Sequence, residues 1–380
     1  MIRTRTAIAA AIVAAELLVL AACSGGDDDA ASSTTEAAPA TSATTTEAPT
    51  TSSTTTAAPA TTAAPATTAP PTSIETTTTT EPDILRMPLT GVPISDPSEI
   101  PQRPAQAVKI DNVGPARPQS GLNSADIVFE EIINDGATRF AAVFQSQGVD
   151  TVGPVRSGRH PDIEILEAFD HPLFVWSGGN GGVTYYIQHS ELVDLSANHT
   201  SGYYRRSGRR RPWNLYTSSE AMWSHAPADF HVPPQVFKYL LPDEPIQNGE
   251  AATTINVTMD NVQVRWEYNP DDGLYHRFQD GGPHNTEDAG QVTTNNLVLM
   301  MANYLPSPID ARTPDAQTLG SNPVYVFTGG TVRSGSWLRF KSTDPYQFFD
   351  NFTDLNPIEL QAGRTWVELP RNIEGSVSWS

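Results

Sequence analysis

The sequence holds a single cysteine, Cys23, among 380 residues, so no disulfide can form within the chain. Disulfides often support exported domains, and without them the fold must be held together by its apolar core. Positive charge is scarce too, because 23 Lys and Arg face 43 Asp and Glu and the net charge is −20. This balance argues against nucleic acid and anionic lipid as general partners.

The N-terminus has the pattern of a lipoprotein export signal. Two arginines precede an apolar run from Ala7 to Ala22, and small residues lead directly into Cys23. The run is too short to favour a membrane-spanning helix. We therefore predict a signal peptide over residues 1–22 and acylation of Cys23, with palmitate as the expected acyl group. This places the chain at the extracytoplasmic face of the cell membrane. Glu16 interrupts the apolar run, which leaves an atypical export signal as the alternative.

Residues 23–82 consist largely of Thr, Ala, Pro and Ser. Such a segment has almost nothing to bury, so we predict a disordered tether between the lipid and the rest of the chain. Its composition also resembles that of O-glycosylated stalks. The first 82 residues carry 2 Lys or Arg and 8 Asp or Glu, so residues 83–380, which we call the head, keep a net charge of about −14.

The head is predicted to contain two domains, 83–245 and 250–380, with an α+β fold overall. In the first, short apolar strands alternate with short helices, which indicates an α/β-type domain. Its predicted strands are 107–110, 127–133, 140–144 and 173–176, and its predicted helices are 161–168 and 183–188. The second is predicted to be mostly β, because closely spaced strands are separated by Gly- and Asp-rich turns. Its predicted strands are 254–259, 262–268, 274–278, 297–301, 324–327 and 337–340.

Long motifs run through the whole head. They include Val108-Lys109-Ile110-Asp111-Asn112 and the stretches 116–130, 138–140, 153–159, 275–277, 295–296, 324–327, 335–337 and 363–367. Together they resemble the YerB-like lipoproteins, a family built on the N- and C-terminal parts of domain of unknown function 3048. The resemblance covers about residues 97–370 and implies an exported two-domain envelope lipoprotein without an established activity. One departure is Trp213, where the family pattern leads us to expect histidine.

Two glycine-containing turns follow predicted strands and are candidates for a ligand crevice. The first leads into the helix at Pro161, where free N–H groups and the helix dipole favour an anion. At the carboxyl ends of neighbouring strands, two such turns would define a crevice of the kind that α/β sheets use for ligands. The candidate residues are Arg156, Ser157, Arg159, Ser177, Gly178, Gly179 and Asn180. The alternative is that the glycines only make tight turns and the arginines pair with nearby carboxylates.

Several ionisable residues lie in or beside apolar runs, where a charge normally needs a partner. They are Asp111, Glu130, Glu131 and Arg139. Paired carboxylates such as Asp111 and Glu130 could act on a glycosidic bond, while the alternative is a buried structural Arg–carboxylate network that links strands. Separately, we count Asp111, Glu130 and Arg139 among the candidate ligand-binding residues, with Arg139 or Asp111 as partners that would orient a ligand. We find no specific catalytic motif. The histidines, among them His171, lack metal-ligand spacing, so no metal and no cofactor are predicted.

Five arginines lie between Arg205 and Arg211 in an otherwise acidic head. Arginine forks bind phosphate, and the neighbouring Asn214 and Tyr216 suit sugar contacts, so we add these two to the candidate ligand-binding residues. The alternative is a solvated loop. The sequence as a whole favours a non-enzymatic binding module for an anionic or carbohydrate wall polymer or an envelope protein, with a cell-wall-directed glycoside hydrolase as the alternative.

Overall fold

The computed structural model describes residues 84–380. The predicted signal peptide, the acylation site at Cys23 and the predicted tether lie outside the described residues. Within the described part, none of the helices combines the length and the apolar character needed to cross a membrane.

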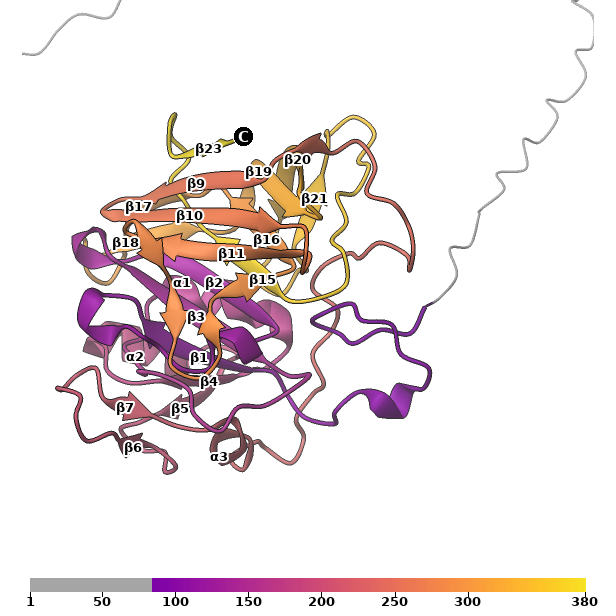
Figure 1. The fold of residues 1–380 in the computed structure, drawn as a ribbon. Coiled ribbons are helices and arrows are strands. Elements are labelled where there is room, and N and C mark those ends of the chain that lie inside the picture. The colour runs from indigo at the N-terminus through magenta and orange to yellow at the C-terminus, as the bar shows by residue number, and fades with distance from the viewer. Residues whose placement is uncertain (1–83) are drawn as a thin grey trace, which may run out of the picture. The chain divides into compact units, whose positions relative to one another are not determined.

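An 11-stranded mixed sheet forms the centre of the head (Figure 1). Its strand order is β21-β20-β19-β16-β22-β2-β3-β1-β4-β5, and β8 also pairs with β20. The bounds are β1 Gln106–Asp111, β2 Ile127–Ile132, β3 Thr138–Phe144, β4 Leu173–Trp176, β5 Val193–Ser196, β8 Glu250–Ala251, β16 Asn296–Met300, β19 Gly320–Thr328, β20 Thr331–Arg339, β21 Gln347–Phe349 and β22 Thr365–Glu368. The central strands β1, β2, β3 and β22 are buried along their whole length, as expected for a sheet that is covered on both sides.

Both halves of the head contribute to this sheet. β22 lies between β2 and β16 and runs parallel to each of them, with Val128 and Leu297 both in register with Trp366. The segments 83–245 and 250–380, predicted as domains, therefore share one continuous sheet. The character of each segment follows the sequence prediction, since the first carries the parallel strands β1, β4 and β5 with helices and the second is mostly β.

A smaller sheet covers one face of the large one (Figure 1). Its strand order is β12-β11-β10-β9-β23, and β15 also pairs with β11. The bounds are β9 Thr254–Met259, β10 Val262–Asn269, β11 Leu274–Gln279, β12 Gly282–Pro283, β15 Thr293–Thr294 and β23 Val377–Trp379. Buried residues of β9 to β11, such as Trp266 and Tyr275, pack with Val108 and Ile110 of β1.

Helices and loops cover the opposite face. Ile165, Phe169 and Ile187 pack with Ala107 and Phe174 of the large sheet. The helices are α1 Pro161–Leu166, α2 Gly181–Gln188 and α3 Ser219–Trp223, and 3-10 turns lie at Pro97–Glu99, Gly114–Ala116, Leu122–Ser124, Asn134–Gly136 and Glu167–Phe169. Pro161 stands at the start of α1, where its missing N–H costs nothing. The predicted helix 161–168 is thus α1 with the 3-10 turn that follows it.

The remaining strands form two-stranded pairs. They are β6 Tyr204–Arg205 with β7 Leu215–Tyr216, β13 Asn285–Thr286 with β14 Gly290–Gln291, and β17 Asn303–Pro306 with β18 Pro314–Gln317. The β17–β18 hairpin matters for the site, because its loop approaches the start of α1 and α2 from the second half of the chain.

Candidate functional site

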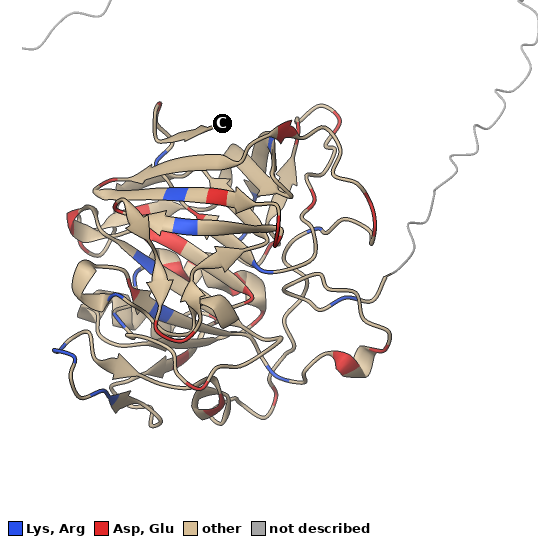
Figure 2. Ribbon diagram, viewed as in Figure 1, with Lys and Arg blue, Asp and Glu red and all other residues tan. Residues whose placement is uncertain are grey.

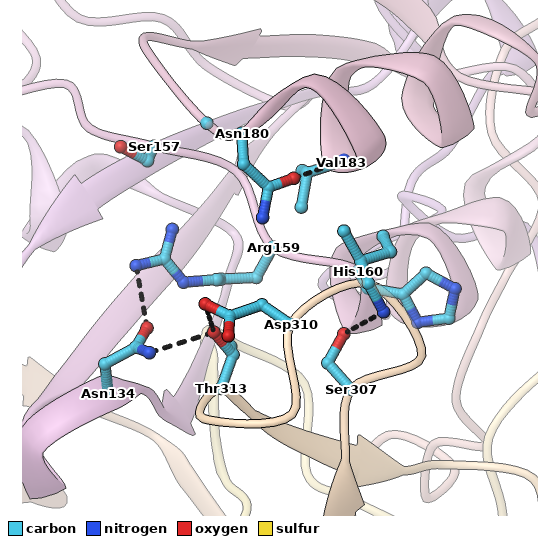
Figure 3. A pocket seen from close by; sticks show the side chains of 11 residues that line it. Asn134, Ser157, Arg159, His160, Asn180, Val183, Ser307, Asp310 and Thr313 are labelled. Carbon is cyan, nitrogen blue, oxygen red and sulfur yellow. Dashed lines mark hydrogen bonds between the residues drawn. The ribbon is translucent and has the colours of Figure 1, made fainter. Parts of the chain in front are cut away.

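A crevice of about 270 Å³ opens between the two predicted glycine turns and the loop of the β17–β18 hairpin (Figure 3). Of the residues predicted from the sequence, Ser157, Arg159, Gly179 and Asn180 line it. The others that line it are Asn134, His160, Val183, Ser307, Ile309, Asp310 and Thr313. Sequence reasoning missed the contributions of Asn134 and the hairpin loop, because they reach the crevice only through long-range packing.

The backbone holds the two turns side by side at the ends of β1 and β4. The backbone N–H of Arg156 donates to the carbonyl of Lys109 at 2.8 Å, and the N–H of Ser177 donates to the carbonyl of Arg156 at 2.9 Å. Gly178 has a φ of 89°, and a Cβ there would lie 3.1 Å from the Ser157 hydroxyl. The close approach of the turns thus depends on glycine at this position. Neither Ser177 nor Gly178 lines the crevice itself.

Arg159 is the cation of the crevice, and Figure 3 shows its side chain between Asn180 and the hairpin-loop residues Asp310 and Thr313. Its Nη1 donates to the carbonyl of Gly158 at 3.0 Å and its Nη2 donates to Oδ1 of Asn134 at 3.2 Å. Both acceptors are neutral, and within residues 84–380 no salt bridge joins Arg159 to a carboxylate. The charge of this half-buried guanidinium is therefore available to a ligand.

Asp310 and His160 are the other charged groups at the crevice, and each has a partner on the protein. Oδ1 of Asp310 accepts from Arg312, and hydrogen bonds from the Arg312 backbone and side chain hold the pKa of Asp310 below its usual value. Nδ1 of His160 lies 3.0 Å from Oδ1 of Asp315, and this hydrogen bond raises the pKa of His160. Protonated, His160 adds a second positive charge beside Arg159.

Arg156 forms a salt bridge with a carboxylate, unlike Arg159, although both belong to the same turn. Its Nε donates to Oδ2 of Asp111 at 2.8 Å, and Asp111 also contacts Arg139 at 3.4 Å. Trp213, at the position where the resemblance predicts histidine, donates its Nε1 hydrogen to the same Asp111 oxygen at 2.9 Å. Burial opposes ionisation of Asp111, but Arg139 and Arg156 outweigh it and lower its pKa.

We expect Arg156→Gln to cost about 2 kcal/mol of folding stability. The substitution removes a charge-assisted hydrogen bond, but Asp111 keeps Arg139 and Trp213, so the cost stays below the 3 to 5 kcal/mol of a fully stranded buried charge. Urea unfolding measures it, with Arg312→Gln, whose side chain is 89% exposed, as a control expected within about 0.5 kcal/mol of the parent. A loss of 4 kcal/mol or more for Arg156→Gln would show that Arg139 and Trp213 do not compensate.

Glu130 and Asp111, the paired carboxylates of the hydrolase alternative, do not line the crevice. Glu130 is fully buried and accepts from Nη2 of Arg277 through both oxygens, at 3.0 and 2.8 Å. Asp111 is 1% exposed and bound as described above. Each carboxylate is thus enclosed with its own arginine, and the two do not face a common open space.

The arginine-rich segment lies on the loop between β6 and β7, where Figure 2 shows basic residues gathered. Arg206 and Arg209 both bond Glu287, and Arg209 also donates to the carbonyls of Ala116 and Pro118. Arg205 donates to Oδ1 of Asn214 at 2.7 Å.

Arg210 and Arg211 of this loop are exposed. The predicted ligand-binding residues Asn214, at the end of this loop, and Tyr216, on β7, are buried, and Arg206 lies over the Tyr216 ring at 4.8 Å. Neither lines the crevice.

Comparisons with known proteins agree on one family. Residues 89–231 match the model described as "Protein of unknown function (DUF3048) N-terminal domain", and residues 254–367 match its C-terminal counterpart. A Bacillus subtilis (strain 168) protein named "Putative lipoprotein YerB" is 27% identical over 300 residues, which cover 77% of this chain and 88% of that protein. The crystal structure of YerB protein from Bacillus subtilis is similar with a TM-score of 0.66 at 25% identity, over 78% of this chain and 99% of that one.

Proposed function

The chain belongs to the DUF3048 family, and from this premise we propose that it is a lipid-anchored envelope protein whose head binds an anionic wall polymer in the Arg159 crevice. The anchoring is supported by the sequence around Cys23 and by the similarity to a protein named as a lipoprotein. Acylation of Cys23 would hold the head at the extracytoplasmic face of the membrane, within reach of the wall.

One observation carries the binding role: Arg159 presents a guanidinium to an open crevice, its hydrogen-bond acceptors are neutral, and no carboxylate within residues 84–380 forms a salt bridge with it. A half-buried cation with only neutral partners gains from an anionic ligand, and the fork geometry of arginine suits phosphate or carboxylate oxygens. Arg139 lies near this guanidinium, since burial and the charge of Arg159 lower the pKa of Arg139 to about 10. Arg139 is paired with Asp111, so Arg159 is the arginine that an anionic ligand in the crevice would neutralise.

The rest of the lining suits a sugar backbone. The amides of Asn134 and Asn180 and the hydroxyls of Ser157 and Ser307 offer donors and acceptors for sugar hydroxyls. Tyr186, which is exposed on α2, stands edge to face with the His160 ring at 5.3 Å and provides an aromatic surface beside the crevice. A polymer with sugar and anionic groups would use both features.

A hydrolase is not proposed, because Asp111 and Glu130 are each enclosed with an arginine and neither lines the crevice. The crevice itself holds one aspartate, Asp310, which is engaged by Arg312 and Thr313. Glycoside hydrolysis needs two carboxyl groups on opposite sides of one bond.

Arg159→Gln is expected to lower the affinity for a purified teichoic-type polymer at least tenfold, with little effect on stability, because the neutral acceptors of Arg159 tolerate its loss. Binding is measured by calorimetry with the full chain. The double variant Arg210→Gln/Arg211→Gln removes two exposed arginines outside the crevice and should bind as the parent does. Parent-like binding by Arg159→Gln would contradict the proposed site. Loss of binding only in the double variant would place the site on the loop between β6 and β7.

A further inference from the structure

A second cluster of ligating side chains lies outside the crevice, at the turn that precedes β4. Asp170 and His171 follow the 3-10 turn Glu167–Phe169, and His231 comes from a loop after α3. One ligand atom from each of these residues lies within 4.8 Å of the others. Nδ1 of His171 is 2.7 Å from Oδ1 of Asp170, and Nδ1 of His231 is 2.8 Å from Oδ2 of the same carboxylate.

A fourth residue, Glu191, orients one of the two imidazoles. Its Oε2 lies 2.8 Å from Nε2 of His171. Both ring nitrogens of His171 face a carboxylate, and in the neutral tautomer that donates Nε2–H to Glu191 the lone pair is on Nδ1, toward Asp170. This is the arrangement in which an outer carboxylate fixes the tautomer of a metal-binding histidine.

The inward-facing atoms require a positive charge between them. With His171 neutral, its Nδ1 lone pair points at an oxygen of Asp170, and two lone pairs at 2.7 Å repel each other. Either a proton or a cation resolves this conflict.

We propose that Asp170, His171 and His231 bind a divalent transition-metal ion of the Zn²⁺ class, with Glu191 as the outer carboxylate that positions His171. Two imidazoles and one carboxylate are a known ligand set for Zn²⁺, whereas Mg²⁺ and Ca²⁺ prefer oxygen ligands throughout. The side chains of the three ligands are 41 to 55% exposed, so water can complete the coordination. The ion would fasten the loop that carries His231 to the turn before β4.

Titration of the full chain with Zn²⁺ tests this proposal, and Cys23→Ser in every sample removes the competing thiol. Calorimetry should show one saturable site, and the melting temperature should rise with Zn²⁺ but not with Mg²⁺. His171→Gln and His231→Gln should each weaken binding at least tenfold and abolish the thermal shift. The control is His276→Gln, since His276 pairs with one carboxylate, Asp272, without a second imidazole, and this variant should bind as the parent does.

Melting the variants without metal separates loss of the site from loss of the fold. All three should stay close to the parent, because the side chains of His171 and His231 are 49% and 55% exposed and His276 pairs with the exposed carboxylate of Asp272. The proposal is overturned if the parent shows no saturable Zn²⁺ binding. It is equally overturned if His171→Gln and His231→Gln keep the affinity of the parent, because the ion then binds elsewhere.

Discussion

Replacing Arg277 by methionine is expected to destabilise the head by about 3 to 5 kcal/mol, because it strands a buried charge. Arg277 is 0% exposed on β11, and its Nη2 donates to both oxygens of Glu130, which is also 0% exposed, on β2. The pair joins the small sheet to the large one across their interface. Methionine fills much of the volume but leaves Glu130 with only Asn112 and Thr138 as donors.

Urea unfolding followed by tryptophan fluorescence measures this loss, and Glu368→Gln is the matched control. Glu368 lies near Arg277, and burial together with the charge of Glu130 raises its pKa to about 8. Glutamine resembles the protonated form that this shift favours, and it can still accept the Nε1 hydrogen of Trp266. The control should lose little stability at pH 7, whereas a loss below 1 kcal/mol for Arg277→Met would contradict the argument.

The Glu368→Gln control should also differ from the parent in the pH dependence of its folding stability. A carboxyl whose folded pKa is raised above its unfolded value near 4.5 binds its proton more tightly in the folded state. The stabilising contribution of Glu368 to folding is therefore fully present below pH 4.5 and is lost as the pH rises toward 8. The Glu368→Gln variant should therefore show a smaller fall in stability than the parent between pH 5 and pH 8.

Lys109→Met should have an effect of similar size, about 3 to 5 kcal/mol. Nζ of Lys109 lies 2.5 Å from Glu131 and 2.6 Å from Asp162, and all three side chains are at most 2% exposed. Burial raises the pKa of Glu131 to about 7, and Lys109 opposes that rise, so removing Lys109 should drive Glu131 toward the protonated form. Asp162 at the start of α1 would remain without its cation.

The loss is again measured by urea unfolding, with the exposed Lys341→Met as the control, which should stay within about 0.5 kcal/mol of the parent. The double variant Lys109→Met/Glu131→Gln should recover part of the loss, because it no longer buries that carboxyl. Equal stability of Lys109→Met and the parent would refute this explanation. The variant should also disturb the crevice, since Asp162 accepts from the backbone N–H of Arg159 at 2.7 Å.

Several strands were predictable from the pattern of apolar residues. Predicted strand 173–176 is β4, an uninterrupted apolar run, and predicted strand 254–259 is β9, in which buried residues alternate with more exposed ones. What the sequence could not supply is the position of β22 between β2 and β16, since the pairing partners are more than 200 residues apart in the chain for β2. The sharing of one sheet by both halves follows from that single insertion.

The candidate site, too, was only partly predictable from the sequence. Residue types and the helix start at Pro161 pointed to Arg156 and Arg159 together, but only the fold separates the arginine that binds Asp111 from the one that faces the crevice. His171 and His231 show no spacing that predicts a metal, because the chain returns to Asp170 only after about 60 residues. Contacts between residues that are far apart in the sequence have no local sequence pattern from which they could be predicted.

Hydrogen exchange of the full chain, with and without a purified teichoic-type polymer, tests the proposed binding site most directly. The proposal predicts slower exchange of backbone amides at three of the segments that line the crevice, residues 157–160, 179–183 and 307–313. All three segments meet at the crevice, and the third lies more than 100 residues further along the chain, so joint protection would locate the ligand. Protection confined to residues 205–211, or unchanged exchange at all three segments under saturating polymer, would contradict it.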